Sequence, residues 1–210
     1  STVYGYAGND SINNTGASVK VYAGEGNDSI RNTGVNAYLD GGAKITLEGA
    51  KGKMININPS VGGKSISNTK ENTLVTATAY NDTIKNTGAK VTIQANGGAD
   101  SINNTGASMK AYGGDGIDTI TNSGASAYID GGAGADKISI TSSATKNTIY
   151  GGMGNDSIYS SVISGVIYSY AKGDGNDYIK GWTDNDTLTI TGGSHKTSVS
   201  GNNVIVSITG

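Results

Sequence analysis

One stretch of the chain, Gly113-Gly114-Asp115-Gly116-Ile117-Asp118-Thr119-Ile120, returns twice in nearly the same form. The second copy reads Gly-Gly-Ala-Gly-Ala-Asp-Lys-Ile at 131–138, and the third reads Gly-Gly-Met-Gly-Asn-Asp-Ser-Ile at 151–158. Two further copies, at 23–30 and 172–179, lack only the first glycine. A motif that recurs at a nearly constant spacing indicates a repeat architecture, in which each copy is one structural unit.

The aspartate of this motif recurs every 18 residues over much of the chain. The column consists of Asp10, Asp28, Asp82, Asp100, Asp118, Asp136, Asp156 and Asp177. Two steps of 18 residues bridge Asp28 to Asp82 and place Thr46 and Lys64 where aspartates would belong. The turn before Asp82 also lacks glycine, so we expect calcium between Asp10 and Asp28 and in the successive gaps from Asp100 to Asp177, with a weaker site between Asp82 and Asp100.

Apolar residues keep the same period in two further columns. Isoleucine lies two residues after most of the aspartates, and a second column consists of Val21, Leu39, Ile57, Val75, Ile93, Ala111 and Ile129. Local alternation of inward and outward side chains is typical of β-strands, and no stripe with the period of a helix is evident. The sequence predicts an all-β, right-handed parallel β-roll (a β-solenoid) with 18 residues per coil and about ten coils.

The C-terminal part of the chain departs from the repeat. We expect the roll at residues 1–179 and a C-terminal β cap at 180–210, because the open end of a solenoid exposes unpaired strand edges. Gly192-Gly193 and Gly201-Asn202-Asn203 are typical of hairpin turns. Trp182 is expected to close the end of the core.

A second corner of each coil reads Asn-Thr-Gly in the best copies. Its asparagines are expected to point inward and to hydrogen-bond to one another along the axis; they are Asn14, Asn32, Asn68, Asn86, Asn104 and Asn122. Glycine is expected to supply a left-handed turn conformation at this corner. The corner is therefore interpreted as structural.

The aspartate corner is suited to a metal ion. Calcium takes six to eight oxygen ligands, and carboxylates together with backbone carbonyls supply them. Without an ion, carboxylates about 5 Å apart repel by about 3 kcal/mol at an effective dielectric constant of about 20. Folding should therefore require calcium. A metal-free solenoid with exposed aspartates at its turns is the alternative.

These copies match the nonapeptide G-G-x-G-x-D-x-U-x, where U is a large apolar residue, and from residue 5 to residue 179 the chain resembles the hemolysin-type RTX calcium-binding repeat proteins. The resemblance implies several Ca²⁺ ions between neighbouring turns, held by the aspartates above and by glycine-bearing turns. Those glycines are Gly24, Gly26, Gly113, Gly114, Gly116, Gly131, Gly132, Gly134, Gly151, Gly152, Gly154, Gly173 and Gly175. Because the calcium nonapeptide alternates here with the Asn-Thr-Gly nonapeptide, we predict one column of ions and not two.

The resemblance also implies a function. It implies a structural module of a secreted or cell-surface bacterial protein that leaves the cell by type I secretion and folds on calcium binding after export. The chain opens in mid-pattern, so we expect the remainder of a larger polypeptide as a partner. The net charge of -2 does not indicate a basic surface that would bind nucleic acid. The sequence has no apolar stretch of about 20 residues, so no transmembrane segment is predicted. Without cysteine and with His195 as the sole histidine, the sequence predicts no enzyme.

Two other interpretations of the outward faces stay open. The outward tyrosines could bind glycans or a cell surface, as in an adhesin; Tyr22, Tyr112 and Tyr150 border the aspartate corner, and Tyr38 and Tyr128 lie on the second strand. The threonines of the Asn-Thr-Gly corner could bind ice. Lys64 could replace a calcium ion with its ammonium group, or it could point into solvent.

Overall fold

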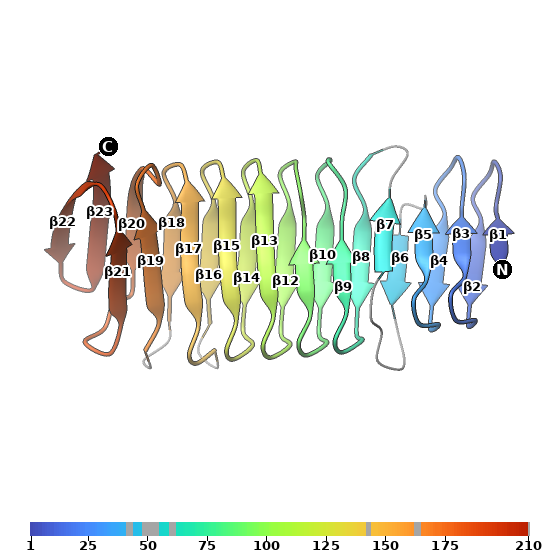
Figure 1. The fold of residues 1–210 in the computed structure, drawn as a ribbon, viewed down its shortest axis with the longest axis horizontal. Helices are drawn as coiled ribbons and strands as arrows, with labels where there is room; N and C mark the ends of the chain where they lie inside the picture. Colours follow the sequence, from blue (N-terminus) through green and yellow to red (C-terminus); the bar gives the residue numbers. More distant parts are fainter. Residues whose placement is uncertain (41–43, 48–54, 59–61, 142–143, 162–164, 210) are drawn as a thin grey trace.

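The computed structural model describes residues 1–40, 44–47, 55–58, 62–141, 144–161 and 165–209. They form two long sheets that face each other along the whole molecule (Figure 1). Up to β21 the strands alternate between the two sheets, so one coil contributes one strand to each sheet and a turn at each corner.

The first sheet has 11 strands. They are β1 (Thr2–Tyr4), β3 (Lys20–Tyr22), β5 (Tyr38–Asp40), β7 (Ile55–Asn58), β9 (Leu74–Thr76), β11 (Thr92–Gln94), β13 (Lys110–Asp115), β15 (Tyr128–Ala133), β17 (Thr148–Met153), β19 (Ile167–Ala171) and β21 (Thr187–Thr191).

The second sheet has 12 strands. They are β2 (Ser11–Asn14), β4 (Ser29–Asn32), β6 (Lys44–Leu47), β8 (Ser65–Asn68), β10 (Thr83–Asn86), β12 (Ser101–Asn104), β14 (Thr119–Asn122), β16 (Lys137–Ile140), β18 (Ser157–Ser160), β20 (Asn176–Lys180), β22 (Ser194–Ser200) and β23 (Asn203–Thr209).

The predicted all-β parallel β-roll is confirmed. Neighbouring strands of each sheet are parallel up to β20 and β21, and Ile84 pairs with Ile102, which pairs with Ile120 in the next coil. Among the residues that the structure describes, no helix is long and apolar enough to cross a membrane.

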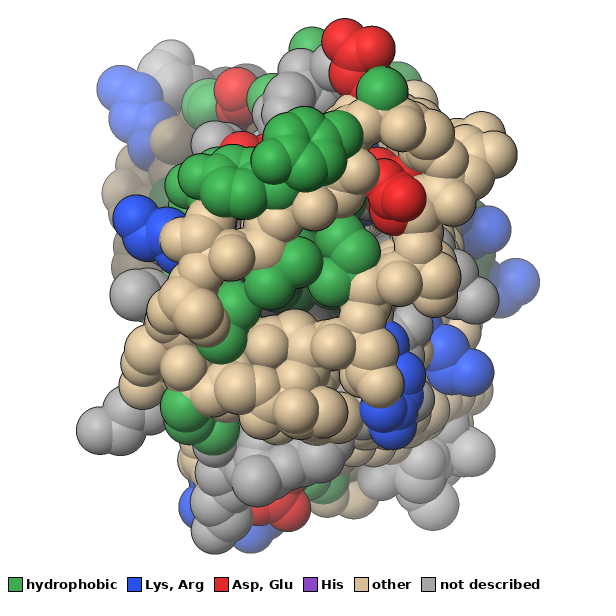
Figure 2. Space-filling view, turned by 90° about the vertical axis from the view of Figure 1, so that its right-hand side faces the viewer, with side chains coloured by type: hydrophobic (Ala, Val, Ile, Leu, Met, Phe, Trp, Pro, Cys, Tyr) green, Lys and Arg blue, Asp and Glu red, His purple; other side chains and the backbone are tan. Residues whose placement is uncertain are grey.

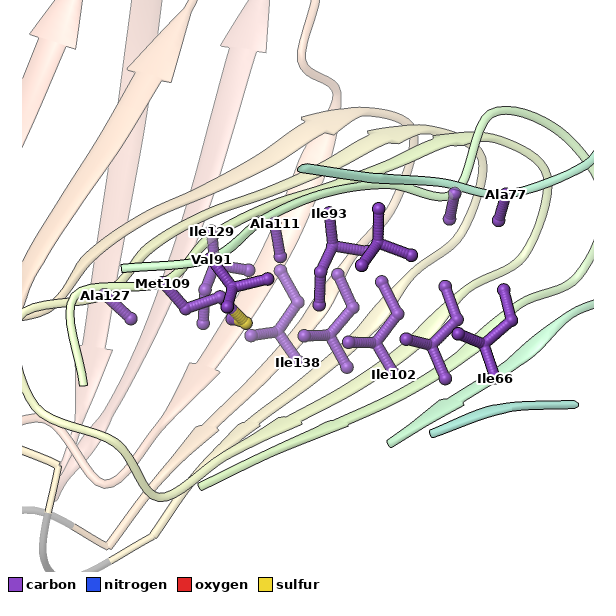
Figure 3. Close-up of a cluster of buried hydrophobic side chains, with 14 of the residues drawn as sticks. Ile66, Ala77, Val91, Ile93, Ile102, Met109, Ala111, Ala127, Ile129 and Ile138 are labelled. Atoms are coloured by element: carbon purple, nitrogen blue, oxygen red, sulfur yellow. The ribbon is translucent and has the colours of Figure 1, made fainter. Parts of the chain in front are cut away.

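The core is a thin double row of apolar side chains between the sheets (Figure 3). Ile66, Ile102 and Ile138 lie in one row, and Ile93 and Ile129 lie in the row that faces it. These side chains are at most 1% exposed. Each coil buries only a few apolar groups, so hydrophobic burial per coil is small compared with that of a two-layer globular domain.

The asparagine ladder is confirmed. The side-chain Nδ2 of Asn86 donates to Oδ1 of Asn104 at 2.7 Å, and Asn104 donates in the same way to Asn122 at 2.6 Å. Oδ1 of Asn104 also accepts the backbone N–H of Gly106, so its amide is satisfied both along the axis and within its own turn. The ladder therefore stabilises the corner without any ligand.

Replacing Asn104 with alanine should lower the free energy of unfolding by about 3 kcal/mol, because each buried polar partner left without a hydrogen bond costs about 1–3 kcal/mol. The measurement is urea unfolding in saturating calcium. The neighbouring exposed residue Asn103 is the matched control, and Asn103→Ala should change stability by less than about 0.5 kcal/mol. Equal losses in the two variants would contradict the structural role of the ladder.

Glycine does not supply the left-handed conformation at this corner, which corrects the expectation from sequence. The positive φ angles belong to residues two positions later, such as Ser108 (56°) and Ser126 (59°). Glycine is needed there for a different reason, since a Cβ on Gly106 would overlap the carbonyl of Gly88 in the preceding coil. The coils approach each other too closely for a side chain at this position.

The register of the third coil also differs from the strict period of 18. Lys44 pairs with Ser29, so Thr46 pairs with Arg31 and does not occupy the aspartate position. The equivalent of Asp28 is residue 43, which lies outside the described residues. The pairing keeps Ile45 in line with Ile30 and Ile66, which shows that the isoleucine column sets the register here and the constant spacing does not.

At the C-terminal end, β20 and β23 pair antiparallel and β23 continues into a hairpin with β22. The predicted turn at Gly201-Asn202 closes this hairpin, whereas Gly192-Gly193 connects strands of different sheets and is not a hairpin turn. The ring of Trp182 packs 5.6 Å from that of Tyr168 against the core. Because β21 still extends the parallel sheet, a boundary between roll and cap at residue 180 stays a prediction.

At the opposite end, β1 and β2 are the outermost strands of the two sheets. Figure 2 looks onto this end and shows hydrophobic side chains at its surface. Val3 is 37% exposed, Tyr4 58% and Tyr6 75%.

Candidate calcium column

The registered aspartates point inward along one corner of the roll, in a short row of Asp10 and Asp28 and a longer row from Asp82 to Asp177. Oδ1 of Asp118 accepts the backbone N–H of Asp100 at 2.8 Å, and Oδ1 of Asp136 accepts that of Asp118 at the same distance. The insertions after Asp136 leave this pattern intact, because Asp156 and Asp177 continue it across steps of 20 and 21 residues. The alternative of exposed aspartates at the turns is thus wrong: Asp118 is completely buried.

The second carboxylate oxygen of most of these residues has no partner. The buried Oδ2 atoms without a hydrogen bond belong to Asp10, Asp28, Asp100, Asp118, Asp136, Asp156 and Asp177. A buried carboxylate oxygen that lacks a donor is costly, so such atoms need an explanation in a native structure. A series of cations along this corner would compensate the negative charge of these unpaired Oδ2 atoms.

The glycines of the motif shape this corner in two ways. The second and fourth residues have positive φ angles, for example 107° at Gly114 and 136° at Gly116. The first glycine makes room: a Cβ on Gly113 would overlap both Oδ2 of Asp118 and the carbonyl oxygen of Gly131 in the next coil. The unpaired carboxylate oxygen therefore lies beside a carbonyl oxygen of the neighbouring turn.

The remaining glycines of the motif follow the same pattern. Gly131 and Gly151 adjoin Oδ2 of Asp136 and Asp156 as Gly113 adjoins that of Asp118. Positive φ angles are found at Gly24, Gly26, Gly132, Gly134, Gly152, Gly154, Gly173 and Gly175.

Two glycines at the second position of the motif both have a positive φ angle, but only one of them lies close to the backbone of the preceding coil. Gly132 has a φ of 108° and its Cβ would overlap the carbonyl of Gly114, whereas Gly173 has a φ of 98° and no atom within 4 Å of that position. Gly173→Ala should therefore cost only the backbone strain, about 1–3 kcal/mol. Gly132→Ala should cost about 1–3 kcal/mol more, because the coils must move apart.

Both variants are measured by thermal unfolding in saturating calcium. Equal destabilisation of the two variants would show that close packing of the turns contributes nothing at this corner.

Burial raises the pKa of the carboxyl groups in the column. It raises the pKa of Asp100 and Asp136 to about 7, of Asp156 to about 6 and of Asp177 to about 8. The backbone N–H donors oppose this rise, and neighbouring aspartates of the column add to it. Without a compensating cation, these carboxyl groups would therefore titrate closer to neutral pH than an ordinary aspartate does.

The oxygen donors present fit calcium. Within the described parts of the chain, no group of three or more histidine or acidic side chains could hold a metal ion by itself. An ion at this corner would thus combine a carboxylate with backbone carbonyls, and such a set of hard oxygen donors is the one that calcium prefers. Zinc and other softer ions favour nitrogen and sulfur ligands.

Asp82 differs from the rest of the column. Its Oδ1 accepts the backbone N–H of Lys64 and its Oδ2 accepts that of Thr78 at 2.7 Å, so neither oxygen is left without a partner. Lys64 is only 8% exposed, and the expectation that its side chain points into solvent is therefore wrong. A bridge from its ammonium group in place of a calcium ion stays a prediction.

Sequence reasoning missed Lys70, which takes the place of glycine in the Asn-Thr-Gly corner. It is fully buried, and its Nζ donates to the carbonyl of Gly34, two coils away, at 2.7 Å. Burial lowers the pKa of this amine. Leu47 stands between Asn32 and Asn68 in the register, so Lys70 connects the two parts of the chain across the interruption of the asparagine ladder. The replacement of a repeated glycine by lysine was the signal in the sequence.

Comparison with known protein families supports calcium as the ion at this corner. The family model described as "RTX calcium-binding nonapeptide repeat (4 copies)" matches residues 1–16, 140–161 and 173–194. These three segments match the RTX calcium-binding repeat family. No curated protein and no solved structure is significantly similar to it. The RTX matches lie toward the two ends of the roll, and the motifs at 113–118 and 131–136 lie between them in the same aspartate column.

RTX repeats are a structural, non-enzymatic kind of domain, and the match together with the β-solenoid fold supports a calcium-binding repeat module. In this chain the calcium nonapeptide alternates with the Asn-Thr-Gly nonapeptide, and the structure places the two at different corners of each coil. One corner carries the aspartates and the other carries the asparagine ladder.

Proposed function

We propose that this RTX module binds several calcium ions in a single column and folds when it binds them, after export of the protein to which it belongs. The observation that carries the proposal is the row of buried Oδ2 atoms without hydrogen-bond partners. In the proposed column, the aspartates supply carboxylate oxygens and the glycine-bearing turns supply carbonyl oxygens. The bound ions would neutralise buried charges that otherwise oppose the stacking of the coils.

A location outside the cell follows from the same chemistry. RTX repeat proteins are typically exported, and calcium is plentiful outside cells and scarce inside them. A module with so thin a core would stay unfolded where calcium is scarce and would become rigid after secretion. We therefore propose a stiff structural segment of a secreted or cell-surface protein.

The test is a calcium titration followed by calorimetry, with variants of two aspartates from one motif. Asp118 is buried in the column, and Asp115 is exposed three residues earlier. Asp118→Asn should bind fewer calcium ions than the natural chain, while Asp115→Asn should bind the same number. Absence of calcium binding, or equal loss in the two variants, would overturn the proposal.

Carbohydrate binding at the outward tyrosines is the second candidate function. The rings of Tyr112 and Tyr128 lie 5.7 Å apart, and those of Tyr128 and Tyr150 lie 5.2 Å apart. All three side chains are half-buried, so the rings cover one another and the sheet beneath. The packing favours a shielding role, and saturable binding on a glycan array that is lost on Tyr112→Ala would favour the carbohydrate.

A further inference from the structure

The turn before Asp82 is built differently from the glycine-bearing turns of the column. Thr78 and Tyr80 occupy the positions of Gly114 and Gly116, and neither of them has a positive φ angle. Oγ1 of Thr78 instead accepts the backbone N–H of Tyr80 at 2.9 Å. This short turn is therefore held by a side chain and follows another backbone path.

The backbone path changes the environment of the carboxylate. The N–H of Thr78 donates to Oδ2 of Asp82, the oxygen that is without a partner in the other aspartates of the column. The N–H of Lys64 donates to Oδ1. Both carboxylate oxygens thus receive charge-assisted hydrogen bonds from fixed backbone donors, which compensate a buried carboxylate without a metal ion.

The carbonyl side of the same corner is also occupied. Ala77 stands where Gly113 and Gly131 stand in the other turns, and its carbonyl oxygen accepts Nδ2 of Asn96 from the next coil at 2.8 Å. The counterpart of Ala77 in the Asp118 turn is Gly113, whereas the carbonyl beside the unpaired Oδ2 of Asp118 belongs to Gly131 in the next coil. The side-chain amide of Asn96 thus occupies a carbonyl oxygen of the turn that precedes Asp82.

We propose that the Asp82 corner is closed by hydrogen bonds and binds no calcium, so that it divides the column into two separate calcium segments. One segment lies at Asp10 and Asp28, and the other extends from Asp100 to Asp177. The inference rests on the proposed function, because it presupposes that the other corners bind calcium. It assigns Asp82 a structural role that the periodic spacing of the aspartates conceals.

The first test uses the natural chain crystallised with calcium and measures the anomalous scattering of the ions. We expect anomalous peaks beside aspartates of both segments and no peak in coordination contact with Asp82. A peak bound to a carboxylate oxygen of Asp82 would overturn the inference and leave the proposed function standing. A map without peaks at any aspartate would overturn the proposed function itself, and the division into segments with it.

A pair of matched variants tests the same point in solution. Asp82→Asn should retain the number of calcium ions bound by the natural chain but should lower the melting temperature, since an amide offers only one acceptor to two backbone donors. Asp118→Asn should bind at least one ion fewer. If Asp82→Asn loses a bound ion while remaining folded, Asp82 is a ligand and the inference is wrong. If the variant does not fold, the anomalous map of the natural chain decides.

Discussion

Removal of calcium near neutral pH should convert the RTX roll from a β-structure into a largely unfolded chain. The stacked aspartates are buried and adjacent along one corner, and burial raises the pKa of Asp136 to about 7 and that of Asp177 to about 8. At about pH 8 the unfolded chain would ionise these groups freely, whereas the metal-free roll would have to bury them as charges or keep them protonated. The small apolar burial of each coil cannot offset several such penalties.

Far-UV circular dichroism of the chelated protein measures this loss, and a calcium titration should restore the β-spectrum cooperatively. Magnesium is the control ion. It requires smaller, near-octahedral coordination and sheds water reluctantly, so it should restore little structure at the same concentration. A β-spectrum that is unchanged by chelation would show that the asparagine ladder and the apolar rows suffice for folding.

Acidification should stabilise the calcium-free protein and destabilise the calcium-bound protein. In the absence of metal, the raised pKa of Asp100, about 7, means that the folded state holds protons that the unfolded state releases above its ordinary carboxyl pKa. The contribution to stability is then fully present below about pH 4 and is lost as the pH rises through about 7. With calcium present, protons compete with the ion for the same oxygens, so affinity falls as the pH is lowered.

The measurement is the β-signal in far-UV circular dichroism across this pH range for protein freed of calcium by a chelating resin, and the melting temperature across the same range for protein with saturating calcium. The two profiles should slope in opposite directions between about pH 5 and pH 8. Asp118→Asn provides the control, because loss of one buried carboxyl group should flatten both profiles. Parallel profiles would show that the aspartates of the column do not control the stability of the roll.

Much of the site was predictable from spacing alone. The recurrence of aspartate, isoleucine and asparagine at fixed offsets placed Asp100, Asp118 and Asp136 in one row and Asn86 and Asn104 in another, as the structure shows. In a parallel solenoid, a residue meets its equivalent in the next coil, so the period of the sequence directly gives the neighbours in space.

Predictions from constant spacing were wrong in the third coil, where the step between equivalent residues is not 18. Thr46 was assigned to the aspartate column, but pairing keeps Ile45 beside Ile30 and Ile66 and shifts the coil. The backbone pairing follows the isoleucine column and not the constant spacing, and a slip of one residue would have reversed the faces of the strand. The same limit applies to the corner glycine, whose role depends on contact with the preceding coil and not on its own turn.

The sequence by itself determined the parallel roll and the two kinds of corner, and it predicted the calcium chemistry, because each depends on residue types that recur at one period. The tertiary structure decided which corners leave a carboxylate oxygen unpaired. Asp82 and Asp118 occupy equivalent positions in the repeat. Oδ2 of Asp82 accepts the backbone N–H of Thr78, whereas Oδ2 of Asp118 has no hydrogen-bond partner. That difference depends on the backbone path of a neighbouring turn, and on hydrogen bonds that form only when the coils are stacked.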